Sequence, residues 1–361
     1  MSTLITIDLD ALTANYHYCR EKVAPASCAA VVKADAYGLG IAHIARALAA
    51  AGCSQFFTAT HGEGLTLRNL LPEAEIYVFE GVTPDSADAF CHHDMVPVLI
   101  RPGQCAEWAE RARAQGSPLP AVLNIDTGMT RLGFGPAELR QSLDRRADFD
   151  WLDIRYVMTH LACADEGESA KVREQLRRFD ELRRLLPPAP TSIGNSAGSL
   201  LGDGFSGDMA RMGIALFGGN PYLDKHHAAR PVLRIQSRIL QLREITEPTP
   251  VGYGATWTAS PGSRIATVGT GYADGYPWSL GNRGVAAIGG RRVPVVGRVS
   301  MDLITLDVTG LPDEWVQPGC LVDLIGPDVS LEEVAERAGT INYEILTRLS
   351  QRARRRYIGG L

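Results

Sequence analysis

Lysine is scarce in this chain of 361 residues. Only Lys22, Lys33, Lys171 and Lys225 occur among 36 basic residues, so arginine is the ordinary surface cation. Lys33 follows directly on an apolar, β-prone run, Ala30–Val32. A lysine in a buried stretch of chain must lose its charge, find a partner or carry a covalent carbonyl adduct, because desolvation lowers its pKa and frees a nucleophilic amine. Lys33 is therefore a candidate for Schiff-base chemistry.

Other absences exclude whole classes of protein. The seven cysteines form no CxxC pair and no compact framework, which favours reduced thiols and gives no support for a metal site. The sequence shows no signal peptide, and no apolar run approaches the roughly 18 residues of a membrane span. The net charge is −5 and the only basic cluster is 352–356, so neither nucleic acid nor an anionic membrane is an expected partner. We expect a cytoplasmic protein.

The order of apolar segments indicates an α/β fold. Short apolar runs alternate with amphipathic segments such as 41–52 and 171–186, in which apolar residues recur with a helical period. Such alternation is typical of a parallel sheet, and eight strands close a (β/α)8 barrel. An open, doubly wound sheet is the alternative. The strands are predicted at 28–33, 55–59, 75–80, 96–100, 120–125, 154–160, 191–196 and 209–217.

A change of pattern after residue 217 predicts a second domain. Residues 218–231 are rich in Gly, Pro and His and are expected to form the linker, which divides the chain into 1–227 and 228–361. Alternating apolar and polar residues then indicate a mainly antiparallel β domain. The first strand, at about 3–8, is expected to pack with this second domain. The alternating stretches are 232–245, 263–276, 291–310 and 320–326.

Two helices are predicted near the end of the chain. Ser330 and Glu333 form a capping-box pattern in front of an apolar repeat at 331–339. Residues 342–355 are expected to form a last helix, and the basic cluster would suit its carboxyl end.

Two short motifs match other enzyme classes, but their context argues against both. GDGFSG at 202–207 matches a dinucleotide-binding fingerprint, yet no strong helical pattern follows it, so a flexible loop is the better interpretation. GNSAG at 194–198 matches the nucleophile elbow of hydrolases. A hydrolase needs a later histidine, and only His226 and His227 in the predicted linker qualify.

Lys33 and the last two barrel strands together suggest a cofactor. At the end of the first strand, Lys33 would face the catalytic mouth of a barrel, where the loops after strands seven and eight commonly bind phosphate. Ser196 and the backbone around Gly213 and Ile214 would lie there. An aldehyde-binding lysine beside a phosphate site is what pyridoxal 5'-phosphate (PLP) requires. From position alone, a salt bridge between Lys33 and Asp35 explains the lysine equally well.

The sequence also resembles the bacterial alanine racemase family from end to end. This resemblance implies a PLP-binding barrel, a C-terminal β domain, and a homodimer in which the partner's C-terminal domain completes each site. The matching segments are AVVKADAYGLG (30–40), DTGMTRLG (126–133), MTHLACADE (158–166), NSAGS (195–199), RMGIALFG (211–218), VGYGATW (251–257), GYADGY (271–276), VGRVSMD (296–302) and INYE (341–344).

The resemblance assigns two acid/base groups. Lys33 would bind the cofactor and act on one face of the substrate, while Tyr253 of the second subunit would act on the other. Inversion at Cα requires a proton to leave one face and return on the opposite one, and planar PLP separates the two faces. His160 and Arg211 would help the Tyr253 phenol to ionise. Taken alone, His160 would be interpreted as a core histidine and Tyr253 as a packed aromatic residue.

Further roles follow from the same resemblance. Arg211 would face the pyridine nitrogen, and because a guanidinium gives up no proton, the ring would be a weaker electron sink, which guards against transamination. Arg131 would approach the cofactor oxygen or the substrate carboxylate. The N–H of Met301 would hold that carboxylate, and Tyr272 would narrow the entrance. The other implied cofactor-binding residues are Tyr37, Asn195, Ser196, Gly213 and Ile214.

Three positions depart from the family pattern. Many relatives carry a lysine, often carbamylated, where this chain has Asn124, so the anion that orients Arg131 is missing and a chloride or another acceptor would replace it. Gln351 and Phe217 stand where tyrosines are common. These changes affect the size and polarity of the pocket rather than the reaction type.

The resemblance predicts an isomerase that interconverts L- and D-alanine, for cell-wall synthesis or for alanine catabolism. The departures leave open a broader specificity that includes serine. A decarboxylase of the same fold and a non-catalytic PLP-binding protein are two further hypotheses.

Overall fold

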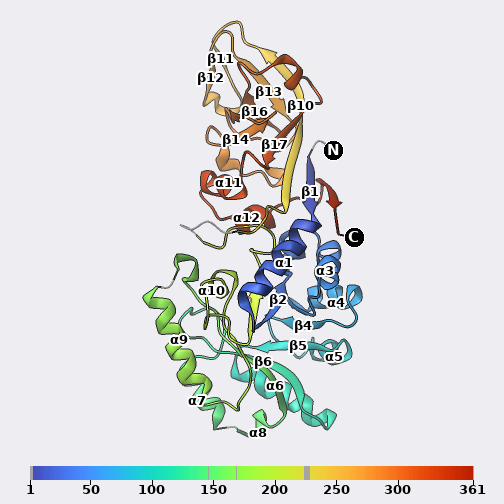
Figure 1. The fold of residues 1–361 in the computed structure, drawn as a ribbon, viewed down its shortest axis with the longest axis vertical. Helices are drawn as coiled ribbons and strands as arrows, with labels where there is room; N and C mark the ends of the chain where they lie inside the picture. The colour runs from blue at the N-terminus through green and yellow to red at the C-terminus, as the bar shows by residue number, and fades with distance from the viewer. Residues whose placement is uncertain (1–2, 145, 168, 223–227, 361) are drawn as a thin grey trace.

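The computed structural model describes residues 3–144, 146–167, 169–222 and 228–360. It is elongated, with a barrel at one end and a mainly β domain at the other (Figure 1). This arrangement confirms the predicted fold class. The division of the chain at residue 227 stays a prediction, and His226 and His227 lie outside the described residues.

The barrel consists of eight strands, whose order in the sheet is β8-β7-β6-β5-β4-β3-β2-β9 with parallel pairing throughout. Between the two end strands, the N–H of Arg211 donates to the carbonyl oxygen of Gly194 at 3.0 Å, which closes the barrel. The strands are β2 (Ser27–Val31), β3 (Gln55–Thr58), β4 (Glu75–Val78), β5 (Met95–Leu99), β6 (Leu119–Asn124), β7 (Leu152–Met158), β8 (Thr191–Ser192) and β9 (Met209–Met212).

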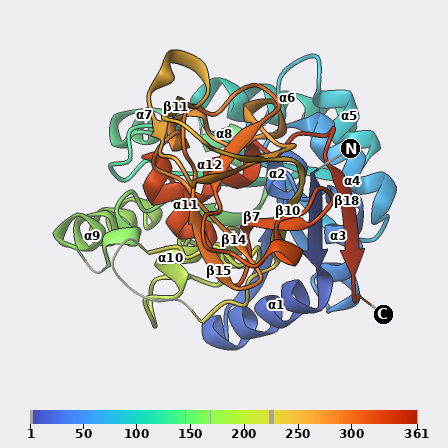
Figure 2. The same ribbon diagram turned by 90° about the horizontal axis from the view of Figure 1, so that it is seen from above.

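Helices surround the barrel because their apolar faces need the strands to cover them. In α3, for example, Ile44 and Leu48 are buried against the strands. Figure 2 looks onto the β domain and shows α1, α3, α4 and α9 around the periphery. The helices are α1 (Leu9–Val23), α2 (Lys33–Tyr37), α3 (Ile41–Ala50), α4 (His61–Leu70), α5 (Ala87–His92), α6 (Pro102–Gln115), α7 (Pro136–Leu143), α8 (Arg146–Phe149), α9 (Ala170–Arg183) and α10 (Ser196–Ser199).

The second domain is built on a twisted sheet with the order β15-β14-β17-β10-β1-β18, to which β13 and β16 are added beside β10. All its pairs are antiparallel except β1 with β18. The strands of this sheet are β1 (Leu4–Asp8), β10 (Leu233–Glu244), β13 (Arg264–Val268), β14 (Val285–Ile288), β15 (Arg291–Pro294), β16 (Ile304–Asp307), β17 (Leu321–Ile325) and β18 (Arg354–Ile358). A separate antiparallel pair is formed by β11 (Thr249–Pro250) and β12 (Thr258–Ala259).

Two helices of this domain face the barrel. In α11 (Leu331–Ala338), the Ser330 hydroxyl accepts the N–H of Glu333 at 3.1 Å, as the capping pattern predicts. The next helix, α12 (Asn342–Thr347), is shorter than expected. None of the described helices is long and apolar enough to cross a membrane. Short 3-10 turns occur at η1 (Ala164–Glu166), η2 (Tyr253–Ala255), η3 (Tyr272–Asp274), η4 (Trp278–Leu280) and η5 (Asp313–Trp315).

The predicted last helix over 342–355 is wrong in its second half. Residues 354–358 form β18, which pairs in parallel with β1. Because β1 would otherwise leave an unpaired edge, the strand satisfies the backbone there. Alternate side chains of β18, Arg355 and Tyr357, are half-buried, while Arg354 and Arg356 are exposed. Burial that alternates with a period of two is the pattern of a strand. It could not be recognised in the sequence, because arginines occupy the half-buried and the exposed positions alike.

Candidate active site

The carboxyl ends of the barrel strands face α11 and α12 across a cavity of about 700 Å³. This is the end at which barrel enzymes place their chemistry. Its walls come from both domains, since Tyr343 of α12 and Glu332 of α11 line it together with the barrel loops. The nine barrel residues expected to contact the cofactor or substrate all line it: Lys33, Tyr37, Arg131, His160, Asn195, Ser196, Arg211, Gly213 and Ile214.

Lys33 lies just beyond β2, at the start of a left-handed turn. Ala34, Asp35, Ala36 and Tyr37 all have φ between 53° and 57°, a conformation that costs an L-residue roughly 1–2 kcal/mol each. Four such non-glycine residues in a row are rare, and strain of this kind gathers at functional sites. The predicted strand to residue 33 therefore ends two residues early, at Val31.

Burial lowers the pKa of the Lys33 amine, and the positive charge of Arg131 lowers it further. The carboxylate of Glu63 acts in the opposite direction. Among the described residues no ion pair includes Lys33, and the carboxylate of Asp35 instead accepts the N–H of Ile41 at 2.7 Å. The salt-bridge explanation for Lys33 is thus not supported, and a free amine is available at the cavity.

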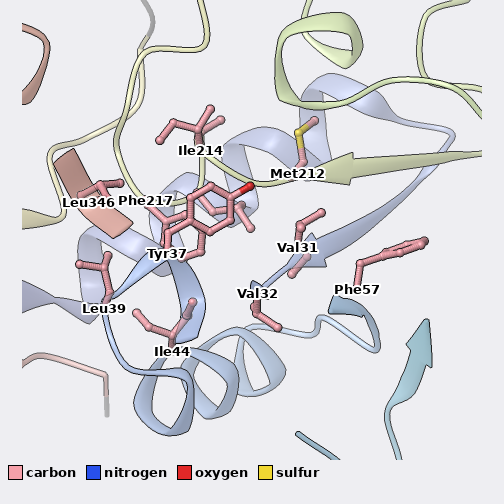
Figure 3. Close-up of a cluster of buried hydrophobic side chains, with 14 of the residues drawn as sticks. Val31, Val32, Tyr37, Leu39, Ile44, Phe57, Met212, Ile214, Phe217 and Leu346 are labelled. Atoms are coloured by element: carbon pink, nitrogen blue, oxygen red, sulfur yellow. The ribbon is translucent and has the colours of Figure 1, made fainter. Parts of the chain in front are cut away.

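Tyr37 and Gly213 approach each other closely. A Cβ atom on Gly213 would lie 2.3 Å from the Tyr37 hydroxyl oxygen, so only glycine fits there. The Ser196 hydroxyl accepts the Gly213 N–H at 2.9 Å. Figure 3 shows the Tyr37 ring among Ile214, Phe217 and other buried apolar side chains, and the rings of Tyr37 and Phe217 are centred 4.7 Å apart. Phe217 therefore fills the core beside Tyr37.

Tyr37, Ser196 and Gly213 together form what we call the cradle. The observed strand and helix boundaries there differ slightly from the predicted ones. The predicted eighth strand over 209–217 ends at Met212, so Gly213 lies in the loop after it, and Ser196 opens α10 rather than ending a strand. Asn195 caps α10, because its side-chain oxygen accepts the N–H of Gly198 at 2.9 Å. N–H groups and hydroxyls thus converge at the point where both loops leave the barrel.

Arg211 is almost completely buried, with 2% of its surface exposed. Its guanidinium donates to the Ser192 hydroxyl and the Thr159 carbonyl, both at 2.7 Å. Burial lowers its pKa to about 9, so it stays protonated at neutral pH. Its Nη2 lies 3.2 Å from Nδ1 of His160, and since a guanidinium only donates, Nδ1 accepts. Burial and the nearby positive charges lower the pKa of His160 to about 3, which makes it a neutral imidazole with its proton on Nε2.

Arg131 is exposed at the rim of the cavity, at the end of a loop that Asp126 organises through the N–H groups of Gly128 and Met129. Asn124 lies beneath this loop. Its Nδ2 donates to the Leu132 carbonyl at 3.0 Å, while its Oδ1 is buried with no hydrogen-bond partner among the residues that the structure describes. The position occupied by a lysine in many relatives is therefore neutral here and holds one unsatisfied acceptor.

Three predicted site residues do not line this cavity. Tyr253, Tyr272 and Met301 lie on the β domain and expose 72%, 45% and 54% of their surfaces. Their loops are neighbours, because the N–H of Tyr272 donates to the Ser300 carbonyl at 3.1 Å and Gly252 lies beside Arg298. Within the single chain they are apart from Lys33.

The sequence did not point to every residue at the site. Tyr343 lines the cavity and its ring is centred 6.1 Å from that of Tyr37. It belongs to the INYE segment, which carried the resemblance but no role. Gln351 is exposed and is not among the lining residues. Glu63 was also missed, although Thr60 and Glu63 form a visible capping-box pattern.

Comparisons with known proteins match this architecture over its whole length. The family model for the alanine racemase N-terminal domain matches residues 7–221, and that for the C-terminal domain matches residues 232–357. The chain belongs to the alanine racemase family. It is thus related to isomerases, and the predicted enzyme class is confirmed.

Individual relatives agree with this family. The alanine racemase of Rhodospirillum rubrum is 46% identical over 99% of this chain and 96% of its own length. That of Methylobacterium nodulans is also 46% identical, over 99% of this chain and 96% of its own. The structure of the Bartonella henselae alanine racemase with covalently bound pyridoxal phosphate superimposes with a TM-score of 0.95 at 36% identity, covering 99% of this chain and 100% of that one.

Proposed function

We propose that this protein interconverts L- and D-alanine with PLP held by Lys33. The observation that carries the proposal is a lysine of lowered pKa, free of any ion pair among the described residues, in a cavity that Tyr37, Ser196 and Gly213 also line. The covalently bound PLP of the Bartonella henselae relative supports the same cofactor. Experiment separates this activity from serine racemisation and from decarboxylation.

The residues present fit PLP. Lys33 supplies an amine for its aldehyde, and the Tyr37, Ser196 and Gly213 cradle supplies hydroxyl and N–H donors for its phosphate. Because Gly213 has no Cβ atom, its backbone can lie close to the Tyr37 hydroxyl and to a ligand. When bound, PLP supplies an electron sink for the carbanion that forms at Cα.

Two groups would exchange the Cα proton on opposite faces. Burial and the charge of Arg131 lower the pKa of Lys33, which favours the neutral Nζ that can take up a proton. Tyr253 would be the second group. Because it lies outside its own chain's cavity and is highly exposed, a second subunit would bring it to the site. One proton is then removed by Lys33 or Tyr253 and another is returned by the opposite group.

Arg211 and His160 would set the charge around Tyr253. The Arg211 guanidinium fixes the His160 proton on Nε2, which can donate to a phenolate without releasing a proton itself. The Arg211 guanidinium would also face the cofactor ring nitrogen, to which it gives up no proton.

Arg131 would bind the substrate carboxylate, with the N–H of Met301 and the ring of Tyr272 brought by the second subunit. Exposure at the cavity rim suits Arg131 to this role. Neutral Asn124 fixes the loop through Leu132 but adds no charge to it. This departure from the family pattern leaves serine as a test substrate beside alanine.

The homodimer that this mechanism needs has a suitable contact surface. Exposed apolar and aromatic side chains gather on the β domain, and such surfaces mark interaction sites in water-exposed proteins. They are Tyr253, Tyr272, Trp278, Met301 and Leu303. We place the enzyme in the cytoplasm, with D-alanine supplied to the cell wall or L-alanine to catabolism as its roles.

A chiral product assay tests the proposal. Purified protein incubated with PLP and L-alanine should yield D-alanine without carbon dioxide, and L-serine should react more slowly. Lys33→Ala should lose both turnover and the visible absorption of bound cofactor. Release of carbon dioxide points to a decarboxylase, whereas PLP binding without turnover of any amino acid points to a non-catalytic PLP-binding protein.

A further inference from the structure

We infer that Glu63 is a positioning residue for Lys33, because its carboxylate ties the turn that carries the lysine to the end of the neighbouring strand. The inference rests on the proposed function. It concerns a residue outside the cavity lining, in the first turn of α4.

Both oxygens of Glu63 accept backbone N–H groups from different loops. Oε1 accepts the N–H of Ala34 at 2.7 Å, and Oε2 accepts the N–H of Ala59 at 2.8 Å. Ala34 follows β2 and Ala59 follows β3, which are adjacent in the barrel. In turn, the N–H of Glu63 is held by the Thr60 hydroxyl at 3.3 Å, so helix α4 fixes the carboxylate.

The Ala34 contact matters because of where it falls. The N–H of Ala34 belongs to the peptide that begins at the Lys33 carbonyl, so the bond fixes the orientation of the lysine backbone. Ala34 also opens the four-residue left-handed turn, which L-residues adopt only when the surroundings hold it. Without Glu63, water would be the partner of this exposed N–H, and the turn would lose the hydrogen bond that links it to the end of β3.

The charge of Glu63 acts on the same amine. Around Lys33, Arg131 opposes protonation, His160 is held neutral and the buried Arg211 adds positive charge to the site. Glu63 is the carboxylate that favours the protonated lysine. It thus opposes the effect of burial and of Arg131 on the pKa of Lys33.

The variant Glu63→Gln tests both contributions. A glutamine side chain has one oxygen acceptor, so it cannot accept from both Ala34 and Ala59, and it carries no charge. Glu138→Gln is the matched control. Glu138 occupies the same helical position in α7, where it accepts the N–H of the N-cap residue Gly135 at 2.9 Å, and it is exposed.

Two measurements on the holoenzyme distinguish the positioning of Lys33 from a mere loss of the capping interaction at the start of α4. Hydrogen exchange of residues 33–40 should be about tenfold faster in Glu63→Gln than in wild type, as one lost hydrogen bond predicts. The pH midpoint at which the absorption of the PLP–lysine chromophore changes should fall by about half a unit or more. Glu138→Gln should match wild type in both.

The second variant, Glu63→Asp, keeps the charge but shortens the side chain. It should speed exchange of residues 33–40 while leaving the midpoint near wild type, so it carries the test even if Glu63→Gln does not fold. Equal midpoints and equal exchange in wild type and both Glu63 variants would overturn the inference. A wild type without any PLP absorption overturns the proposed function itself, and this inference with it.

Discussion

Arg355 donates a hydrogen bond of 2.9 Å from Nη2 to the carbonyl oxygen of Gly38, although 317 positions separate the two residues. Two residues further along β18, the Tyr357 hydroxyl donates to the Leu39 carbonyl at 2.9 Å, and its ring stacks on His43. Strand β18, at the edge of the sheet, therefore holds the segment that follows Lys33.

Arg355→Ala should weaken that hold. Loss of the bond to the Gly38 carbonyl, which is buried with its residue, should lower the free energy of unfolding by about 1–2 kcal/mol. Urea denaturation measures this. The exposed neighbours on the same strand are the controls, and Arg354→Ala and Arg356→Ala should each change the stability by less than about 0.5 kcal/mol. Equal losses in all three variants would contradict the specific contact.

Subunit mixing tests whether sites are shared between chains. Lys33→Ala and Tyr253→Phe homodimers should each be inactive in racemisation, because each site lacks one proton-transfer group. After subunit exchange, a mixed dimer has one site with both groups intact, so a fully exchanged equal mixture should recover about a quarter of wild-type activity. Lys33→Ala mixed with Lys33→Arg offers no intact site and should recover none. Absence of recovery in the first mixture, despite exchange, would exclude a shared site.

The neutral state of His160 predicts a pH effect on stability. Its pKa is 6.5 in an ordinary environment and about 3 in the folded protein, so between these values the unfolded chain binds a proton that the folded protein does not. The free energy of unfolding should therefore fall as pH drops from 6.5 toward 3. The contribution is at most about 1.4 kcal/mol per pH unit.

His160→Asn should remove this contribution, because asparagine keeps an acceptor for Arg211 but cannot be protonated. Urea denaturation of wild type and variant at several pH values gives the two slopes, and wild type should show the steeper one. The exposed His17 on α1 supplies a control, His17→Asn, which should retain the wild-type slope. Parallel curves for wild type and His160→Asn would show that this imidazole is not held neutral.

Ala34→Gly should stabilise the protein, against the usual effect of glycine. Ala34 is exposed and has φ 53°, which glycine adopts without strain, and the N–H that Glu63 accepts is kept. After the entropy cost in the unfolded chain, we expect a gain of about 0.5–1 kcal/mol. Ala106→Gly in α6 should instead lose about 1 kcal/mol. Thermal unfolding of the two variants gives the opposite signs directly.

The barrel could be predicted from sequence because its strands are short and apolar and alternate with amphipathic helices. Each predicted strand lies within a few residues of the observed one, as β3 at Gln55–Thr58 illustrates. Their ends could not be predicted, because Ala34, Asp35 and Ala36 give no local signal for positive φ. That conformation is imposed by contacts with Glu63 and β18.

The C-terminal strand shows a similar limit. Its arginines suggested a helix end, since charged residues favour helices and solvent, and only the unpaired edge of β1 reveals that a strand belongs there. The chemistry of the site was easier to predict than its supports. Lys33 and Arg211 carry reactive or charged groups whose burial needs explaining. Arg355 instead acts through hydrogen bonds to the backbone carbonyls of Gly38, Leu349 and Ser350, which no motif encodes.

A chain carrying D-alanine at position 34 or 36 would be free of backbone strain at that position of the turn Ala34–Tyr37. The backbone angles of this turn are the mirror image of those of an ordinary α-helix, so inverting the chirality of a residue turns an unfavourable conformation into a favoured one. The segment after Lys33 is therefore left-handed. Among the residues that the ribosome incorporates, only glycine adopts this conformation without strain. A semisynthetic protein with D-alanine there would hold the lysine with less help from Glu63 and Arg355.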